Sequence, residues 1–123
     1  MAVSTTGPLL IVEDDGLIRM DLADTLQDAG YAVLEAANAD EAWAILLETD
    51  VSALITDIDM PGSMDGLELA RRVCDRWPDC QIIVISGRYN PEASTLPPDA
   101  IFLTKPVGET ELFKALEARG LAV

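Results

Sequence analysis

Four short apolar runs, separated by segments with helical periodicity, restrict the fold of this chain more than any other feature. Each run is uninterrupted, which is typical of strands buried on both faces rather than strands with one face in water. The runs are Leu9 to Val12, Val51 to Thr56, Gln81 to Ser86 and Ile101 to Leu103. A weaker run from Tyr31 to Glu35 follows the predicted helix stop Gly30 and predicts a fifth strand near an edge. The pattern therefore favours a five-stranded parallel sheet.

Most intervals between these runs contain apolar residues at helical spacing. The stripes are Ile18, Leu22, Leu26 and Ala29, then Ala42, Ile45 and Leu46, then Leu67, Ala70, Cys74 and Trp77, and finally Leu112, Phe113 and Leu116. Asn38, with Glu41 three residues later, is a candidate cap for the second helix. Strands that alternate with helices require right-handed crossovers, which place helices on both faces of the sheet. We therefore predict a doubly wound α/β fold.

The interval from Gly87 to Ala100 is the exception. Its prolines at 91, 97 and 98 leave room for a turn or two of helix around Glu92 to Leu96, so we expect mostly loop there and a fourth helix that is short or absent. The chain shows no internal repeat, low-complexity tract or linker. We expect residues 1–123 to form one domain with its core at about 9–119.

The charge balance excludes several function classes. Eight Lys and Arg against 22 Asp and Glu give a net charge of −14, so nucleic-acid phosphates and anionic membranes would repel the molecule, and we expect neither as a direct partner. The chain has no His, which excludes a histidine base, a histidine ligand or a phosphohistidine on this chain. No signal-like opening or membrane span is visible, and two Cys do not make a disulfide scaffold, so we expect a cytoplasmic protein with free Cys74 and Cys80.

Acidic residues follow two of the predicted strands at the edge where ligands of parallel sheets bind. Glu13 and Asp14 follow the first strand, and Asp57 follows the third. Three carboxylates in one crevice repel one another unless a hard divalent cation balances them. Oxygen ligands without His or an obvious thiolate favour Mg²⁺ over Zn²⁺. We therefore expect Mg²⁺ at this edge.

Ser86 and Lys105 follow the fourth and fifth predicted strands at the same edge. A lysine ammonium and a serine hydroxyl could hold the oxygens of a phosphoryl group carried by Asp57. A carboxylate is a competent nucleophile for phosphoryl transfer when cations absorb the charge, and no general base is required. Each residue alone is an ordinary turn, loop or surface residue, so the hypothesis of an aspartyl phosphate rests on their convergence.

These motifs together resemble the receiver domain of two-component response regulators, from about Leu9 to Leu116. The matching segments are LLIVEDD at 9–15, LITDIDMPGSMDGLELA at 54–70, IIVISG at 82–87 and FLTKP at 102–106. The resemblance implies a flavodoxin-like fold with strand order 2-1-3-4-5. It also implies Asp57 as the phosphoacceptor, Glu13 and Asp14 as the acidic pair at the metal, and the backbone carbonyl of Asp59 as a further metal ligand.

The same resemblance implies the parts of a conformational switch. Ser86 matches the switch hydroxyl, and Lys105 matches the lysine that binds the phosphoryl group. Phe102 stands where the family usually has a Tyr or Phe whose rotamer reports activation, although a buried aromatic on the last strand explains it equally well. Pro106 matches the family's usual cis Lys-Pro peptide.

Two departures from the family pattern concern loops. Ser63 is one extra residue in the loop between Asp57 and Gly66, and only 18 residues separate Ser86 from Lys105, a few fewer than is usual. The shortened segment falls where the fourth helix of the family normally lies. We therefore expect the active residues to be unaffected and the usual output face to differ.

The resemblance implies a phosphoacceptor that takes a phosphoryl group from a histidine kinase or phosphotransfer protein, hydrolyses it slowly and changes conformation to control an unidentified partner. Such a domain is not a conventional turnover enzyme. One alternative is a haloacid-dehalogenase-like phosphatase, which also has a D-x-D motif, here Asp57 and Asp59, but places its acidic pair after the lysine. A binding module that is never phosphorylated is the other alternative, and it would not need the complete set of acidic, hydroxyl and lysine groups.

Overall fold

The computed structural model describes residues 7–60, 64–87 and 96–121. Its sheet consists of β1 (Leu9–Val12), β2 (Val33–Ala36), β3 (Ala53–Asp57), β4 (Gln81–Ser86) and β5 (Ile101–Thr104). Its helices are α1 (Gly16–Asp28), α2 (Ala39–Glu48), α3 (Gly66–Arg76) and α4 (Glu109–Ala118). The strands are parallel and lie in the order β2-β1-β3-β4-β5, as the resemblance implied.

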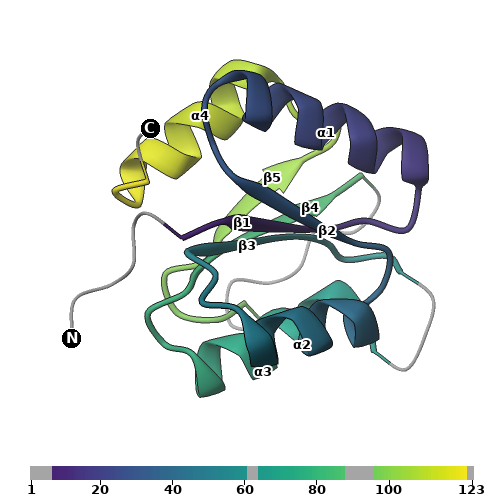
Figure 1. Ribbon diagram of the computed structural model, residues 1–123, viewed down its shortest axis with the longest axis vertical. Helices are drawn as coiled ribbons and strands as arrows, with labels where there is room; N and C mark the ends of the chain where they lie inside the picture. The colour runs from purple at the N-terminus through teal and green to yellow at the C-terminus, as the bar shows by residue number, and fades with distance from the viewer. Residues whose placement is uncertain (1–6, 61–63, 88–95, 122–123) are drawn as a thin grey trace.

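The sheet separates two apolar cores (Figure 1). Helices α1 and α4 cover one face, and α2 and α3 cover the other. Successive residues of a strand point to opposite faces, so Leu9 and Ile11 pack on the α1 and α4 side while Leu10 and Val12 pack on the other. All residues of β1 and β3 are buried, which confirms the prediction of strands covered on both faces for the middle of the sheet. The prediction is wrong for Ile101 to Leu103, which are only partly buried because β5 lies at the edge of the sheet.

Local signals in the sequence set the helix ends. Asp15 caps α1, because its side chain accepts hydrogen bonds from the backbone N–H groups of Leu17 and Ile18. Asn38 caps α2 as predicted and accepts a 2.9 Å hydrogen bond from the N–H of Glu41. Gly30 follows α1 with φ at 106°, a conformation that glycine adopts without strain.

Three strands differ from the predicted bounds, and β5 differs only in ending at Thr104 instead of Leu103. β2 begins at Val33, because the N–H of Tyr31 bonds to the carbonyl of Leu26 and closes the end of α1 instead of entering the sheet. β3 begins at Ala53, and it extends to Asp57, so the aspartate is the last strand residue rather than the first loop residue. This placement fixes the backbone of Asp57 in the ladder opposite Ile85.

The predicted loop between Gly87 and Ala100 lies mainly outside the described residues, as do Ser63 and most of the possible helix at 92–96. Four helices are found in the described part of the chain, with none there between β4 and β5. After β5, the peptide between Lys105 and Pro106 is cis, as expected. None of the helices in the described ranges has the length and apolar character to cross a membrane.

Candidate functional site

The carboxyl ends of β1, β3 and β5 bring three charged side chains into contact. The Nζ atom of Lys105, just after β5, lies 2.9 Å from Oδ2 of Asp57 and 3.0 Å from Oε1 of Glu13. Both carboxylates are almost fully buried, whereas the lysine side chain is 28% exposed. The sequence therefore predicted correctly that these three residues converge.

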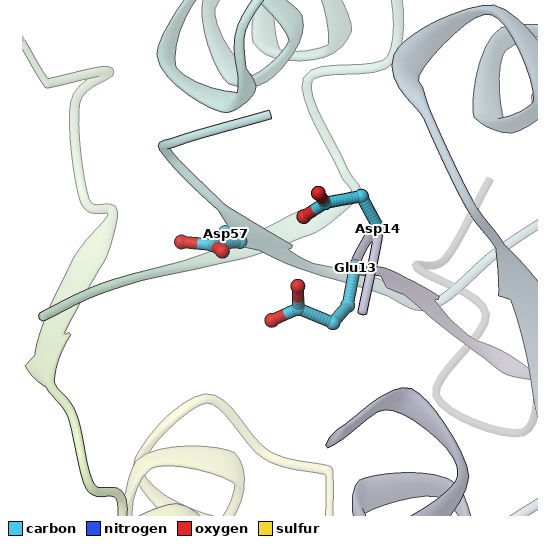
Figure 2. Close-up of side chains that lie close together, drawn as sticks. All are labelled: Glu13, Asp14 and Asp57. Atoms are coloured by element: carbon cyan, nitrogen blue, oxygen red, sulfur yellow. The ribbon is translucent and has the colours of Figure 1, made fainter. Parts of the chain in front are cut away.

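A third acidic residue, Asp14, completes a cluster of oxygen ligands. Glu13, Asp14 and Asp57 each offer one carboxylate oxygen, and these three atoms lie within 4.8 Å of one another. Figure 2 shows the side chains of Glu13 and Asp14 directed toward Asp57. Oδ1 of Asp57 is buried and has no hydrogen-bond partner among the described residues. An orphaned carboxylate oxygen beside two more carboxylates fits a hard divalent cation such as Mg²⁺.

The electrostatics of the cluster depend on its burial. Burial raises the pKa of Glu13 above its ordinary value, and the hydrogen bonds from the backbone of Asp15 and from Lys105 offset this only in part. Burial alone would lower the pKa of Lys105, but its contacts with Asp57 and Glu13 outweigh that effect and raise it. Lys105 therefore stays protonated at neutral pH and partly balances the two buried carboxylates.

The remaining predicted residues lie around this centre. Ser86 is buried as the last residue of β4, and its carbonyl accepts a 3.0 Å hydrogen bond from the N–H of Lys105. Asp59 is exposed two residues beyond Asp57, and its side chain is not part of the carboxylate cluster. Phe102 lies in β5 opposite Val84 and is partly buried against the core on the α2 and α3 side. Both readings of Phe102, switch residue and core aromatic, fit this position.

Gly66 is a residue whose importance the sequence analysis missed. It is the first residue of α3, and a Cβ atom built there would lie 1.6 Å from the carbonyl oxygen of Asp57. Its N–H donates a 3.0 Å hydrogen bond to the carbonyl of Ile58. Glycine therefore allows α3 to begin in direct contact with the backbone of Asp57. The available signal was a glycine inside a helix, where it has low propensity unless close packing requires it.

A cavity of about 550 Å³ opens beside the carboxylates. Glu13, Asp57 and Lys105 line its polar part. Ile18 and Leu22 of α1 and Leu112 of α4 line its apolar part. A molecule that enters from the α1 and α4 side could therefore reach Asp57.

The two cysteines are free, as expected. Burial raises the pKa of Cys80 to about 12, so its thiol is protonated at neutral pH. Neither Cys74 nor Cys80 contributes to the cluster around Asp57.

Comparison with known proteins identifies the family. The profile of the response regulator receiver domain matches residues 9–117. The receiver protein CpdR of Brucella abortus is 41% identical over 113 residues, which cover 89% of this chain and 92% of CpdR. The sensor kinase CckA of the same organism is 37% identical over 115 residues, 89% of this chain but 12% of the kinase.

A solved structure agrees with these sequence relatives. The response regulator TrrA of Thermotoga maritima, determined in complex with Mg²⁺-BeF, superposes with a TM-score of 0.82 at 29% identity. The superposition covers 91% of this chain and 97% of TrrA. None of the matches described here is a phosphatase, so the dehalogenase-like alternative gains no support. The chain belongs to the response regulator receiver domain family and is a phosphoacceptor signalling domain of the two-component type.

Proposed function

We propose that Asp57 is the phosphoacceptor and that the acidic cluster around it holds Mg²⁺. The observation that carries this proposal is the environment of the Asp57 carboxylate, in which Oδ2 contacts Lys105 while Oδ1 is buried without a partner among the described residues. Glu13 and Asp14 supply two further carboxylate ligands for the cation, and the backbone carbonyl of Asp59 is a fourth proposed ligand. When bound, Mg²⁺ would neutralise these carboxylates and polarise an oxygen of the incoming phosphoryl group.

The proposed reaction is transfer from a phosphorylated histidine of a partner. A carboxylate oxygen of Asp57 attacks phosphorus, the bond between phosphorus and the imidazole nitrogen breaks, and its electron pair leaves with the imidazole. Lys105 balances charge on a phosphoryl oxygen and Ser86 donates a hydrogen bond to another. Hydrolysis by water later returns the free carboxylate and inorganic phosphate, which resets the domain.

We also propose which surface meets the phosphodonor. Leu17, Ile18 and Met20 of α1 are 80%, 45% and 56% exposed, although each is large and apolar. They lie in the first turns of the helix that follows Glu13 and Asp14, and Ile18 also lines the cavity that reaches Asp57. An apolar surface beside a reactive group suits docking of a helical partner that carries the phosphohistidine.

The phosphoacceptor proposal is tested by intact-mass measurement after incubation with acetyl phosphate and Mg²⁺. The wild-type protein should gain one adduct of about 80 Da, the mass of one phosphoryl group. Asp57→Asn should gain none, whereas Asp24→Asn, a charge-matched change at an exposed position of α1, should behave as wild type. An equal adduct on Asp57→Asn would exclude Asp57 as the acceptor.

The docking proposal is tested with Leu17→Gln and, as its control, Leu47→Gln, which alters a leucine of α2 that is 52% exposed. Transfer from a histidine phosphodonor should slow by about tenfold or more for the first variant only, because burial of one leucine contributes about 1.5–3 kcal/mol. Phosphorylation by acetyl phosphate should be unchanged in both. Equal transfer rates for the two variants would place the docking surface elsewhere.

A two-state switch completes the proposed function. Movement of Ser86 toward the phosphoryl group would alter the segment that follows it and the surroundings of Phe102, and so change a surface recognised by a downstream partner. Ser86 and Phe102 lie on the neighbouring strands β4 and β5, which supports this coupling. We also propose that the protein acts in the cytoplasm, because phosphotransfer of this kind couples to kinases in that compartment.

A further inference from the structure

Arg19 joins three elements next to the acidic cluster. Its Nη1 atom donates a 2.8 Å hydrogen bond to the backbone carbonyl of Glu13, and its Nε atom lies 3.2 Å from Oε1 of Glu35 on β2. Arg19 belongs to α1, and its own N–H bonds to the carbonyl of Asp15. The guanidinium therefore connects the first turn of α1 and the end of β2 to the loop that carries the acidic pair.

The bond to Glu13 acts on the peptide that leads into Asp14. The N–H of Glu13 donates to the carbonyl of Ala36, and its carbonyl accepts from Arg19, so both sides of this residue's backbone are held. The Glu13 side chain is also held, by the N–H of Asp15 and by Lys105. Asp14, in contrast, is exposed, and the direction of its side chain depends on its backbone.

The charge and the geometry of Arg19 have opposite effects on a bound cation. A guanidinium beside a cation site repels the cation, so charge alone would make Arg19 unfavourable for binding Mg²⁺. Glu35 opposes this effect by pairing with Arg19, and the two side chains are 22% and 38% exposed. Geometry is therefore the contribution that Arg19 can make to the acidic cluster.

We propose that Arg19, held by Glu35, is a positioning residue that fixes the peptide between Glu13 and Asp14 so that both carboxylates face Asp57. The proposal rests on the metal site described above. It adds Arg19 and Glu35, which do not contact the cation themselves. Arginine suits this role because its rigid fork of donors reaches two acceptors at once.

The test measures the dissociation constant for Mg²⁺ by calorimetry at fixed ionic strength. Arg19→Lys keeps the charge but replaces the planar fork, whose Nη1 and Nε atoms reach the Glu13 carbonyl and Glu35 separately, with one ammonium group that lacks this fixed spacing of donors. We expect binding about three- to tenfold weaker, which corresponds to the usual net worth of one hydrogen bond. Circular dichroism at the titration temperature verifies that each variant is folded.

Arg19→Gln separates positioning from electrostatics, because the two effects have opposite signs. Loss of the positive charge alone would tighten Mg²⁺ binding, whereas loss of the positioning contact would weaken it. Arg72→Gln is the matched control, since Arg72 pairs with Glu68 on the exposed face of α3 and its loss removes the same charge. We expect weaker binding for Arg19→Gln and no change for Arg72→Gln. Tighter binding for Arg19→Gln would overturn the proposal.

Glu35→Gln is a milder change, because it leaves the hydrogen bond from Arg19 to the carbonyl of Glu13 in place. It should weaken Mg²⁺ binding less than Arg19→Lys, and the double variant should be no weaker than Arg19→Lys alone, because the two residues act through one contact. Additive effects would show that Glu35 acts independently and would contradict the proposal.

Two reference measurements distinguish failure of this inference from failure of the metal site. If wild type bound no Mg²⁺, or if Asp14→Asn bound it as well as wild type, the metal site itself would be wrong. If Asp14→Asn lost binding while Arg19→Lys matched wild type, the metal site would stand and the role of Arg19 would be wrong.

Discussion

The ammonium group of Lys105 lies 2.9 Å from Oδ2 of Asp57, so one oxygen of this buried carboxylate is held while the other has no partner among the described residues. The contact joins the end of β3 to the residue after β5, with β4 between them in the sheet. It neutralises part of the charge of Asp57 and leaves Oδ1 for a further ligand. The stability and the chemistry of the site therefore depend on the same pair.

Removal of the Lys105 ammonium should destabilise the fold. Lys105→Met leaves Glu13 and Asp57 buried without their shared cation, and we expect the free energy of unfolding to fall by about 1–3 kcal/mol, the usual worth of hydrogen bonds to charged groups. Denaturant unfolding at neutral pH without Mg²⁺ measures this. Lys114→Met, at an exposed position of α4, is the control and should change little.

A second variant tests whether the loss of stability in Lys105→Met comes from the unpaired carboxylate of Asp57. In the Lys105→Met background, Asp57→Asn should restore part of the lost stability. If the double variant were less stable than Lys105→Met alone, the unpaired carboxylate would not be the cause.

Magnesium should stabilise the folded protein through the acidic cluster. At a concentration about 100 times the dissociation constant, binding should add roughly 2.7 kcal/mol to the free energy of unfolding. Melting with and without Mg²⁺ at fixed ionic strength measures the effect. Asp14→Asn should lose most of it and Asp24→Asn, which removes one exposed charge of α1, should keep it. An equal shift in both variants would indicate general screening of the −14 charge instead.

Gly66 should tolerate no side chain. Gly66→Ala forces a Cβ atom against the backbone of Asp57, and we expect a loss of about 2 kcal/mol or more together with slower phosphorylation. Gly16→Ala is the matched control, since Gly16 is also the first residue of a helix but its Cβ would lie 3.8 Å from Nη2 of Arg19, an ordinary contact. Unfolding curves should show a large loss for the first variant and nearly none for the second. Equal stability of the two variants would contradict the close approach of α3 to Asp57.

The raised pKa of Glu13 predicts how stability changes with pH. Because burial raises this pKa in the folded state above 4.5, folding favours the protonated form. The stabilisation that comes from protonated Glu13 is complete below the pKa of this residue in the unfolded chain. It is lost as the pH rises through the pKa of Glu13 in the folded protein. Glu13→Gln does not ionise, so its stability relative to wild type should increase as the pH rises above 4.5 and through the raised pKa of the folded protein.

The pH prediction is checked with unfolding curves in the absence of Mg²⁺. The exposed Glu48→Gln variant of α2 removes the same charge away from the cluster and serves as the control. A difference between Glu13→Gln and wild type that does not change with pH would show that Glu13 carries no raised pKa in the folded protein.

The sequence predicted the parts of the fold and site that follow from local patterns. Uninterrupted apolar runs such as Leu9–Val12 indicated strands covered on both faces, and the rule that ligands bind at the carboxyl ends of parallel strands predicted that Glu13, Asp57 and Lys105 converge. Asn38 and Gly30 were readable as helix ends because their capping and turn preferences are local.

Contacts between distant segments were not readable in the same way. The glycine at position 66 indicates close packing but does not identify the backbone of Asp57 as the partner, and Arg19 has the spacing of an ordinary surface residue of α1. Tyr31 has high strand propensity, but its backbone is used to close α1 and its hydroxyl donates to the carbonyl of Leu121. Tertiary contacts overrode local preference at each of these positions.

The central claim is that phosphorylation occurs on the side chain of Asp57. The most direct test identifies which aspartate carries the acyl phosphate in the phosphorylated protein. Borohydride reduces an acyl phosphate to an alcohol, so treatment after phosphorylation should convert one aspartate to homoserine. Peptide mapping by tandem mass spectrometry then locates it. We predict homoserine at position 57 in wild type and none in Asp57→Asn or in protein never exposed to a phosphodonor. Homoserine at Asp14, Asp59 or any other aspartate, with Asp57 unchanged, would contradict the assignment.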